Sequence, residues 1–182
     1  MARLYRAVDK LGLALMVIAG VALLLMLLNV VGDIAGKYLF SQPIPGTIQI
    51  VSWYYMVAAV FLPIAYVQLK RENLMVELFT MGLSERKRSA FDGVAEIAGF
   101  IYIGLLTWLV FNEAMAATAR NEIQDITYLD MPVWPARWIL PIAFGLMAIV
   151  MLLQAIDDLR FAITGKGPRH FSPQTSHDLE GI

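Results

Sequence analysis

The chain has 182 residues, of which 59% are hydrophobic and only 16% are charged, and its formal net charge is −1. A soluble domain carries about 25% charged residues, so this composition excludes an ordinary soluble domain. The absence of cysteine excludes disulfides, thiolate chemistry and iron–sulfur clusters. Both histidines, His170 and His177, lie in the C-terminal tail, so neither can bind a haem inside a helix bundle.

Four uncharged runs hold most of the apolar residues: 11–31, 47–69, 97–112 and 138–156. An uncharged run of about 18 or more residues is typical of a membrane-spanning helix. The third run is shorter, but it reaches this length if Glu96 and Glu113 lie near the membrane interfaces. The first run is longer than the core of a signal peptide, which has about 7–15 residues, and therefore predicts an uncleaved helix.

The runs predict an all-α membrane protein with one domain over residues 1–164. Its four transmembrane helices are expected at about residues 11–32, 47–69, 90–118 and 134–158. Pro63 and Pro141 fall inside the second and fourth helices and are expected to bend them. The tail over 165–182 is rich in Gly, Pro, Ser and His, and we expect it to be disordered in the cytoplasm.

Most of the 14 basic residues lie before the first run, between the second and third, or after the fourth. Because basic residues in short loops stay cytoplasmic, the sequence predicts a multi-pass membrane protein with both termini inside. The connections over 33–46 and 113–133 are then outside. All four tryptophans, which are Trp53, Trp108, Trp134 and Trp138, fall near the outer ends of the helices. They indicate either an interfacial aromatic belt or a surface for another protein.

The segment between the second and third helices is too polar to span a membrane. Leu74, Leu78 and Met81 recur at spacings of four and three, which predicts an amphipathic helix over 73–85 on the inner surface. The basic cluster Arg86, Lys87 and Arg88 is expected to contact anionic lipid headgroups. A plain connector with no regulatory role is the alternative interpretation.

Residues 120–138 form an acidic outer stretch with Glu122, Asp125 and Asp130. This stretch is either a docking surface for a partner or a solvated loop, and the sequence leaves both interpretations open.

The four membrane runs contain few side chains that could take part in catalysis or ligand binding. Glu96 and Glu113 are separated by about 25 Å along a helix, so they cannot act on one bond. The sequence has no phosphate loop, zinc-ligand spacing or nucleophile elbow, and we expect no catalytic residue, metal, cofactor or nucleic acid. A stand-alone carrier needs facing polar groups at mid-membrane, which the runs lack. The remaining interpretation is a non-catalytic subunit of a larger membrane complex.

Two stretches, "GKYLFSQPIPGTIQIVSW" (36–53) and "FLPIAYVQLKRENLMVEL" (61–78), resemble the small permease subunit of tripartite ATP-independent periplasmic (TRAP) transporters. The matching residues are Lys37, Tyr38, Pro43, Ile44, Gly46, Lys70, Arg71, Leu74 and Val76. The stretch "PVWPARWILPIAFGLMAIVMLL" (132–153) is also similar to the family. The sequence departs from it at Gln49 and Asn73, where the family often has glutamate and histidine, so a charge-dependent role at Gln49 is in doubt.

The resemblance implies a protein of the bacterial inner membrane that is a scaffold for a large permease subunit, which carries the substrate and sodium sites. It also implies a periplasmic binding protein that delivers an organic acid, and uptake driven by a sodium gradient. The candidate partner-interface residues are then Lys37, Tyr38, Pro43, Gly46, Gln49 and Trp53. Under this interpretation Glu122, Asp125 and Asp130 help dock the binding protein, and membrane lipids are further partners. An accessory subunit of another transport or respiratory complex is the alternative.

Overall fold

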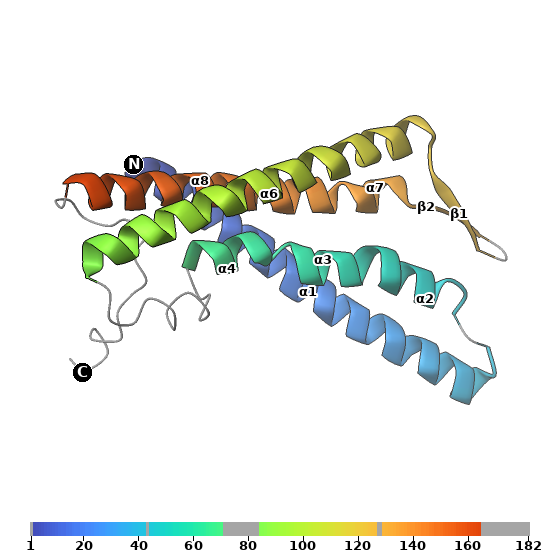
Figure 1. Cartoon of the computed structure of the whole chain (residues 1–182). Coiled ribbons are helices and arrows are strands. Elements are labelled where there is room, and N and C mark those ends of the chain that lie inside the picture. The colour runs from blue at the N-terminus through green and yellow to red at the C-terminus, as the bar shows by residue number, and fades with distance from the viewer. Residues whose placement is uncertain (1, 43, 71–83, 127–128, 165–182) are drawn as a thin grey trace, which may run out of the picture.

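The computed structural model describes residues 2–42, 44–70, 84–126 and 129–164, and it contains four helical spans (Figure 1). Each is long and apolar enough to cross a membrane: Tyr5–Phe40, Thr47–Lys70, Arg86–Ala119 and Trp134–Thr164. The predicted four-span architecture is therefore confirmed. The predicted segments 73–85 and 165–182 lie wholly or largely outside the described residues.

The helices extend beyond the predicted apolar runs. Helix α1 (Ala2–Phe40) has 39 residues, or about 58 Å, which is well above the roughly 30 Å of bilayer hydrocarbon. Helix α6 (Glu85–Ala119) begins before the predicted start at 90, so Arg86, Lys87 and Arg88 lie in its first turns and not in a loop. Lipid offers no hydrogen-bond partners, so an apolar segment keeps its backbone bonds internal and remains helical despite glycines such as Gly20.

The second span is interrupted at Pro63, as the sequence predicts. It consists of α2 (Thr47–Ile50), the π-helical turn η1 (Val51–Tyr55), α3 (Met56–Phe61) and α4 (Ile64–Lys70). Pro63 lies between α3 and α4 and has no N–H to donate, so the regular bonding stops there. The N–H groups of Tyr66 and Val67 then donate to the Pro63 carbonyl, both at 3.0 Å, and start α4.

The fourth span is interrupted just before its proline. It consists of α7 (Trp134–Arg137) and α8 (Ile139–Thr164), with the break at Trp138. Pro141 lies in the first turn of α8, and its missing N–H leaves the Arg137 carbonyl without its usual helical donor. The proline therefore separates α7 from α8 and does not bend the middle of the span.

The outer stretch before the fourth span contains a β-hairpin, so the expectation of an all-α fold with a 113–133 loop is wrong there. Helix α6 continues to Ala119, and strands β1 (Ile123–Ile126) and β2 (Leu129–Pro132) then pair antiparallel. Their register places Gln124 opposite Met131 and Asp125 opposite Asp130. Four-residue strands are too short for periodicity to reveal them in a sequence.

The buried core lies where α1, the second span and α8 meet. Two clusters of small and aliphatic side chains form it: Val8, Ala65, Leu69, Leu146, Val150 and Leu153 in one, and Ala19, Ala22, Ala58, Leu62 and Ala143 in the other. Helix α6 packs mainly along α8. Figure 1 shows Ala2 and the end of α8 at one end of the bundle, here called the terminal end. The β-hairpin and the α1–α2 connection lie at the other, here called the hairpin end.

Candidate functional site

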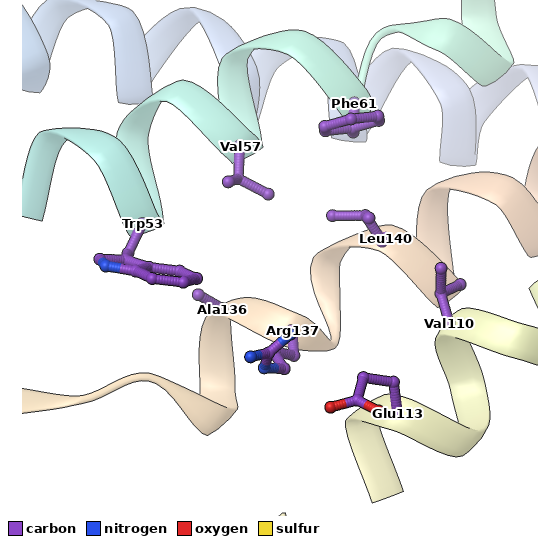
Figure 2. A pocket seen from close by; sticks show the side chains of 8 residues that line it. All are labelled: Trp53, Val57, Phe61, Val110, Glu113, Ala136, Arg137 and Leu140. Carbon is purple, nitrogen blue, oxygen red and sulfur yellow. The ribbon is translucent and has the colours of Figure 1, made fainter. Parts of the chain in front are cut away.

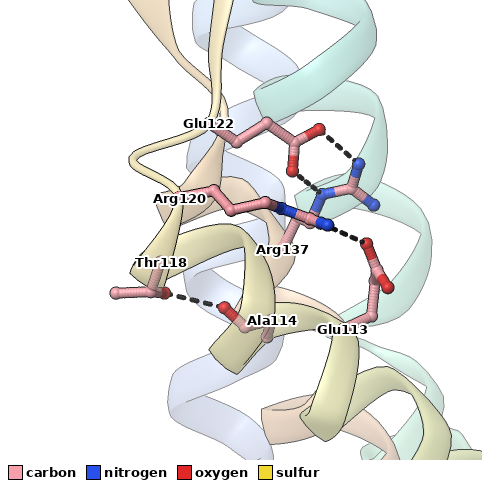
Figure 3. Close-up of polar contacts among 6 residues, drawn as sticks. All are labelled: Glu113, Ala114, Thr118, Arg120, Glu122 and Arg137. Atoms are coloured by element: carbon pink, nitrogen blue, oxygen red, sulfur yellow. Dashed lines mark hydrogen bonds and ion pairs between the residues drawn. The ribbon is translucent and has the colours of Figure 1, made fainter.

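The hairpin is held to the bundle by a bidentate ion pair (Figure 3). Arg137 in α7 donates from Nη2 to Oε1 of Glu122 at 2.6 Å and from Nε to Oε2 at 2.9 Å. Both side chains are about 30% exposed, so the pair is only partly screened by solvent. The Glu122 carbonyl also accepts the N–H groups of Val133 (2.9 Å) and Trp134 (3.4 Å). Glu122 therefore closes the base of the hairpin and is not a free surface charge.

Aromatic side chains support the same anchor. The Tyr54 hydroxyl donates to the Pro132 carbonyl, which ties the hairpin to η1. The Arg137 guanidinium lies 5.8 Å from the Trp53 ring centroid, within range of a cation–π contact. Trp138 donates from Nε1 to Thr118 Oγ1 at 3.0 Å, which joins the break between α7 and α8 to α6. Trp53 and Trp138 thus contribute specific contacts beyond a lipid belt, whereas Trp108 faces outward.

Glu113 forms a weaker ion pair nearby. Arg120 Nη2 lies 3.3 Å from Glu113 Oε1, and both side chains are more than half exposed. An exposed pair of this kind contributes little to stability, so Glu113 is a locally paired carboxylate.

The Arg137 hydrogen bonds hold the pKa of Glu122 below its ordinary value. Because the folded-state pKa is lower than the unfolded one, the pair stabilises the fold at neutral pH. This contribution is lost as the pH falls below about 4.3, the unfolded value, and through the folded one. We expect the protection of the Val133 amide against hydrogen exchange, relative to its intrinsic rate at each pH, to fall across this acid range. Glu122→Gln, which has no carboxylate to titrate, should show no such step.

The α1–α2 connection brings several of the motif residues together at the hairpin end. Asp33 Oδ1 accepts the Ile44 N–H at 2.6 Å, so this carboxylate braces the turn. Gly46 has φ 86°, a left-handed conformation that favours glycine. Helix α1 closes with a bond from Gln42 N–H to the Gly36 carbonyl at 3.2 Å. A Cβ on Gly36 would lie 2.9 Å from the Gln42 oxygen, so this closure also requires glycine.

Two further motif residues of this connection face away from the chain. Tyr38 is 81% exposed, and Lys37 is also exposed. Gln49 in α2 is half-buried, and no described residue hydrogen-bonds to its side chain. Pro43 lies outside the described residues. Lys37 and Tyr38 are thus not needed for packing within this chain.

Asp125 and Asp130 face each other across the two strands, and both are exposed. Like charges directly opposite in a β-ladder destabilise it, so this pair is not there to hold the hairpin. Of the three predicted docking residues, Glu122 is used in the ion pair with Arg137. Asp125 and Asp130 remain exposed to solvent.

A polar cluster at the terminal end was not singled out by the sequence analysis. Gln68 in α4 donates from Nε2 to both carboxylate oxygens of Glu96 in α6 (3.1 and 3.2 Å) and to Gln154 Oε1 in α8 (3.0 Å). Gln154 is fully buried and donates from Nε2 to the Gln68 carbonyl at 3.0 Å. Since α4 ends at Lys70, this carbonyl lacks a helical donor, and Gln154 caps the helix.

Two further contacts extend the polar cluster. Ser89 in α6 and Asp158 in α8 are both buried, and the Ser89 hydroxyl donates to the Asp158 carbonyl at 2.9 Å. Lys70 pairs with Asp9 of α1 at 3.3 Å. The signal for this cluster was present, because a lone glutamine in an uncharged membrane run is unfavourable unless another polar group meets it.

The polar side chains of this cluster connect helices of the same chain. Among the described residues, no group of three or more His, Cys, Asp or Glu side chains could hold a metal ion. The fold and these sites define a small multi-pass membrane protein whose polar groups tie its own helices together.

The chain belongs to the family of tripartite ATP-independent periplasmic transporters, DctQ component, whose model matches residues 26–161. It is thus a small membrane subunit of a TRAP transporter, as the motifs over 36–53 and 61–78 indicated. Comparisons with curated proteins and with solved structures gave no match.

Proposed function

We propose that this chain is the scaffold subunit of a sodium-coupled transporter for organic acids and binds no substrate itself. The observation that carries the proposal is the apolar outer surface of α6. Its exposed side chains include Ile97, Ile101, Tyr102, Leu105, Trp108, Leu109 and Met115. Helix α6 packs mainly on α8, so this face is free for lipid or for the large permease subunit.

Two glycines support the proposal that a helix of another subunit packs closely against this chain. A Cβ on Gly20 of α1 or on Gly104 of α6 would meet nothing within 4 Å in this chain. Glycine lets membrane helices approach closely, and inside this chain neither position serves that purpose. The moving part of a transporter needs a neighbouring subunit that keeps a fixed position in the bilayer. A subunit whose polar side chains bond to one another inside its own bundle is suited to this role.

Co-purification tests the scaffold role. The large permease subunit should be retained by the wild-type chain and lost when Gly104→Leu places a bulky side chain on the α6 face. Leu105→Met, which keeps an apolar side chain of similar volume on the same face, is the matched control and should retain the large subunit. If the wild-type chain transports an organic acid alone in vesicles, the scaffold proposal is wrong.

We further propose that both termini are cytoplasmic, so that the hairpin faces the periplasm and meets the binding protein. The start of α1 and the end of α8 lie at the same end of the bundle, which supports a common side for both (Figure 1). The exposed carboxylates of Asp125 and Asp130 then provide a docking surface whose strength falls with salt.

The double charge reversal Asp125→Lys/Asp130→Lys tests docking. We expect weaker uptake in reconstituted vesicles with the binding protein present, with unchanged co-purification of the large subunit. Lys87→Glu, an exposed charge change at the terminal end, should leave uptake unaltered. Unchanged transport in the double variant would show that the hairpin does not dock the binding protein.

A further inference from the structure

A cavity of about 220 Å³ opens between the second, third and fourth spans near the hairpin end (Figure 2). Its apolar lining consists of Trp53, Val57, Phe61, Val110, Ala136 and Leu140. The charged lining residues are Glu113 and Arg137. The cavity exists because α6 packs on α8 whereas η1 and α3 pack on α1, so η1 and α6 lie apart there.

Water is a poor occupant of this space. The volume corresponds to about seven water molecules, but apolar walls give water few hydrogen-bond partners. The helices around the cavity belong to membrane-spanning segments, so lipid acyl chains are the molecules that surround them. Phe61 lies about 12 Å further along the second span than Trp53, so the apolar part extends from the hairpin end toward the middle of the membrane.

The charged groups at the cavity retain free hydrogen-bonding capacity. Arg137 uses Nε and Nη2 on Glu122, and no described residue accepts a hydrogen bond from its Nη1. Glu113 accepts from Arg120 on Oε1, and no described residue donates to Oε2. An Arg donor is well suited to a phosphate oxygen, and a carboxylate oxygen to an ammonium group.

We propose that this cavity binds a phospholipid whose headgroup carries a primary amine. A segment of one acyl chain fills the apolar part, the phosphate binds Arg137 Nη1, and the amine binds Glu113. The charges of Glu113, Arg120, Glu122 and Arg137 cancel, which favours a zwitterionic headgroup over a net anionic one. The bound lipid fills the space between η1 and α6 and stiffens the hairpin end.

Native mass spectrometry of the purified full-length chain, alone and with the large subunit, tests the site. Phosphatidylethanolamine and phosphatidylglycerol are the probes, and the wild type should retain the former preferentially. Val110→Trp fills the cavity and should weaken phosphatidylethanolamine binding by about tenfold or more. Val94→Trp places the same residue on an exposed position of α6 and should bind like the wild type.

Two further variants separate lipid binding from a folding defect. Val57→Phe fills the cavity from the opposite wall, and Glu113→Gln keeps its volume but should abolish the preference for phosphatidylethanolamine. Wild-type binding by both cavity-filling variants would overturn the proposal. It would also be overturned if Val57→Cys cross-linked to the large subunit and the complex carried no lipid, because a protein side chain would then occupy the cavity.

Discussion

Gln154→Leu should clearly destabilise the protein. The change removes the acceptor of Gln68 and uncaps the end of α4 at a fully buried position. Net hydrogen bonds between membrane helices are worth about 0.6 to 1.7 kcal/mol, and an unsatisfied buried group adds about 1–3 kcal/mol. We expect a loss of about 2 kcal/mol in the free energy of unfolding. Thermal or detergent-induced unfolding of the full-length chain measures it.

Gln124→Leu is the matched control for this prediction. Gln124 lies exposed in β1, and no described residue hydrogen-bonds to its side chain, so the same substitution removes no internal bond. Equal stability of the two variants would mean that the polar cluster of Gln68, Glu96 and Gln154 does not hold the second, third and fourth spans together. A loss confined to Gln154→Leu would assign the cluster this structural role.

Glu122→Lys should release the hairpin from the bundle. The substitution places a second cation against Arg137 and replaces two hydrogen bonds of 2.6 and 2.9 Å with repulsion. Breaking a charged hydrogen-bonded pair costs about 1.5–3 kcal/mol. We expect faster amide exchange at Val133 and Trp134, whose N–H groups bond to the Glu122 carbonyl, and proteolytic cleavage within 120–133. Transport should fall because the docking surface is displaced.

Asp125→Lys provides the control, because it reverses a carboxylate charge in the same hairpin at an exposed site. It should leave amide exchange at Val133 unchanged or slower, since it removes the repulsion between Asp125 and Asp130. The exchanged pair Glu122→Arg/Arg137→Glu should recover part of the protection. If Glu122→Lys and Asp125→Lys gave the same exchange rates, the Glu122–Arg137 pair would not be the anchor of the hairpin.

Much of the architecture is already determined by the amino-acid sequence. The four uncharged runs predict four spans because lipid cannot hydrogen-bond an open backbone, which leaves an apolar segment only the helix. Pro63 marks the break between α3 and α4 for the equally local reason that proline has no N–H. The family motif around Lys37, Tyr38 and Gly46 identifies the class of transporter without any knowledge of the packing.

Contacts between distant residues were decided only by the tertiary structure. The lone glutamine in the second run indicates that Gln68 needs a polar partner, but not that this partner is Gln154. Nor does the sequence indicate that Glu122 pairs with Arg137, because both contacts depend on how separate helices align. The same alignment makes Glu122 structural while Asp125, three residues later, stays exposed. The arrangement of the helices also creates the cavity between η1 and α6. Such a space depends on the angles at which helices pack, which the sequence of one segment does not determine.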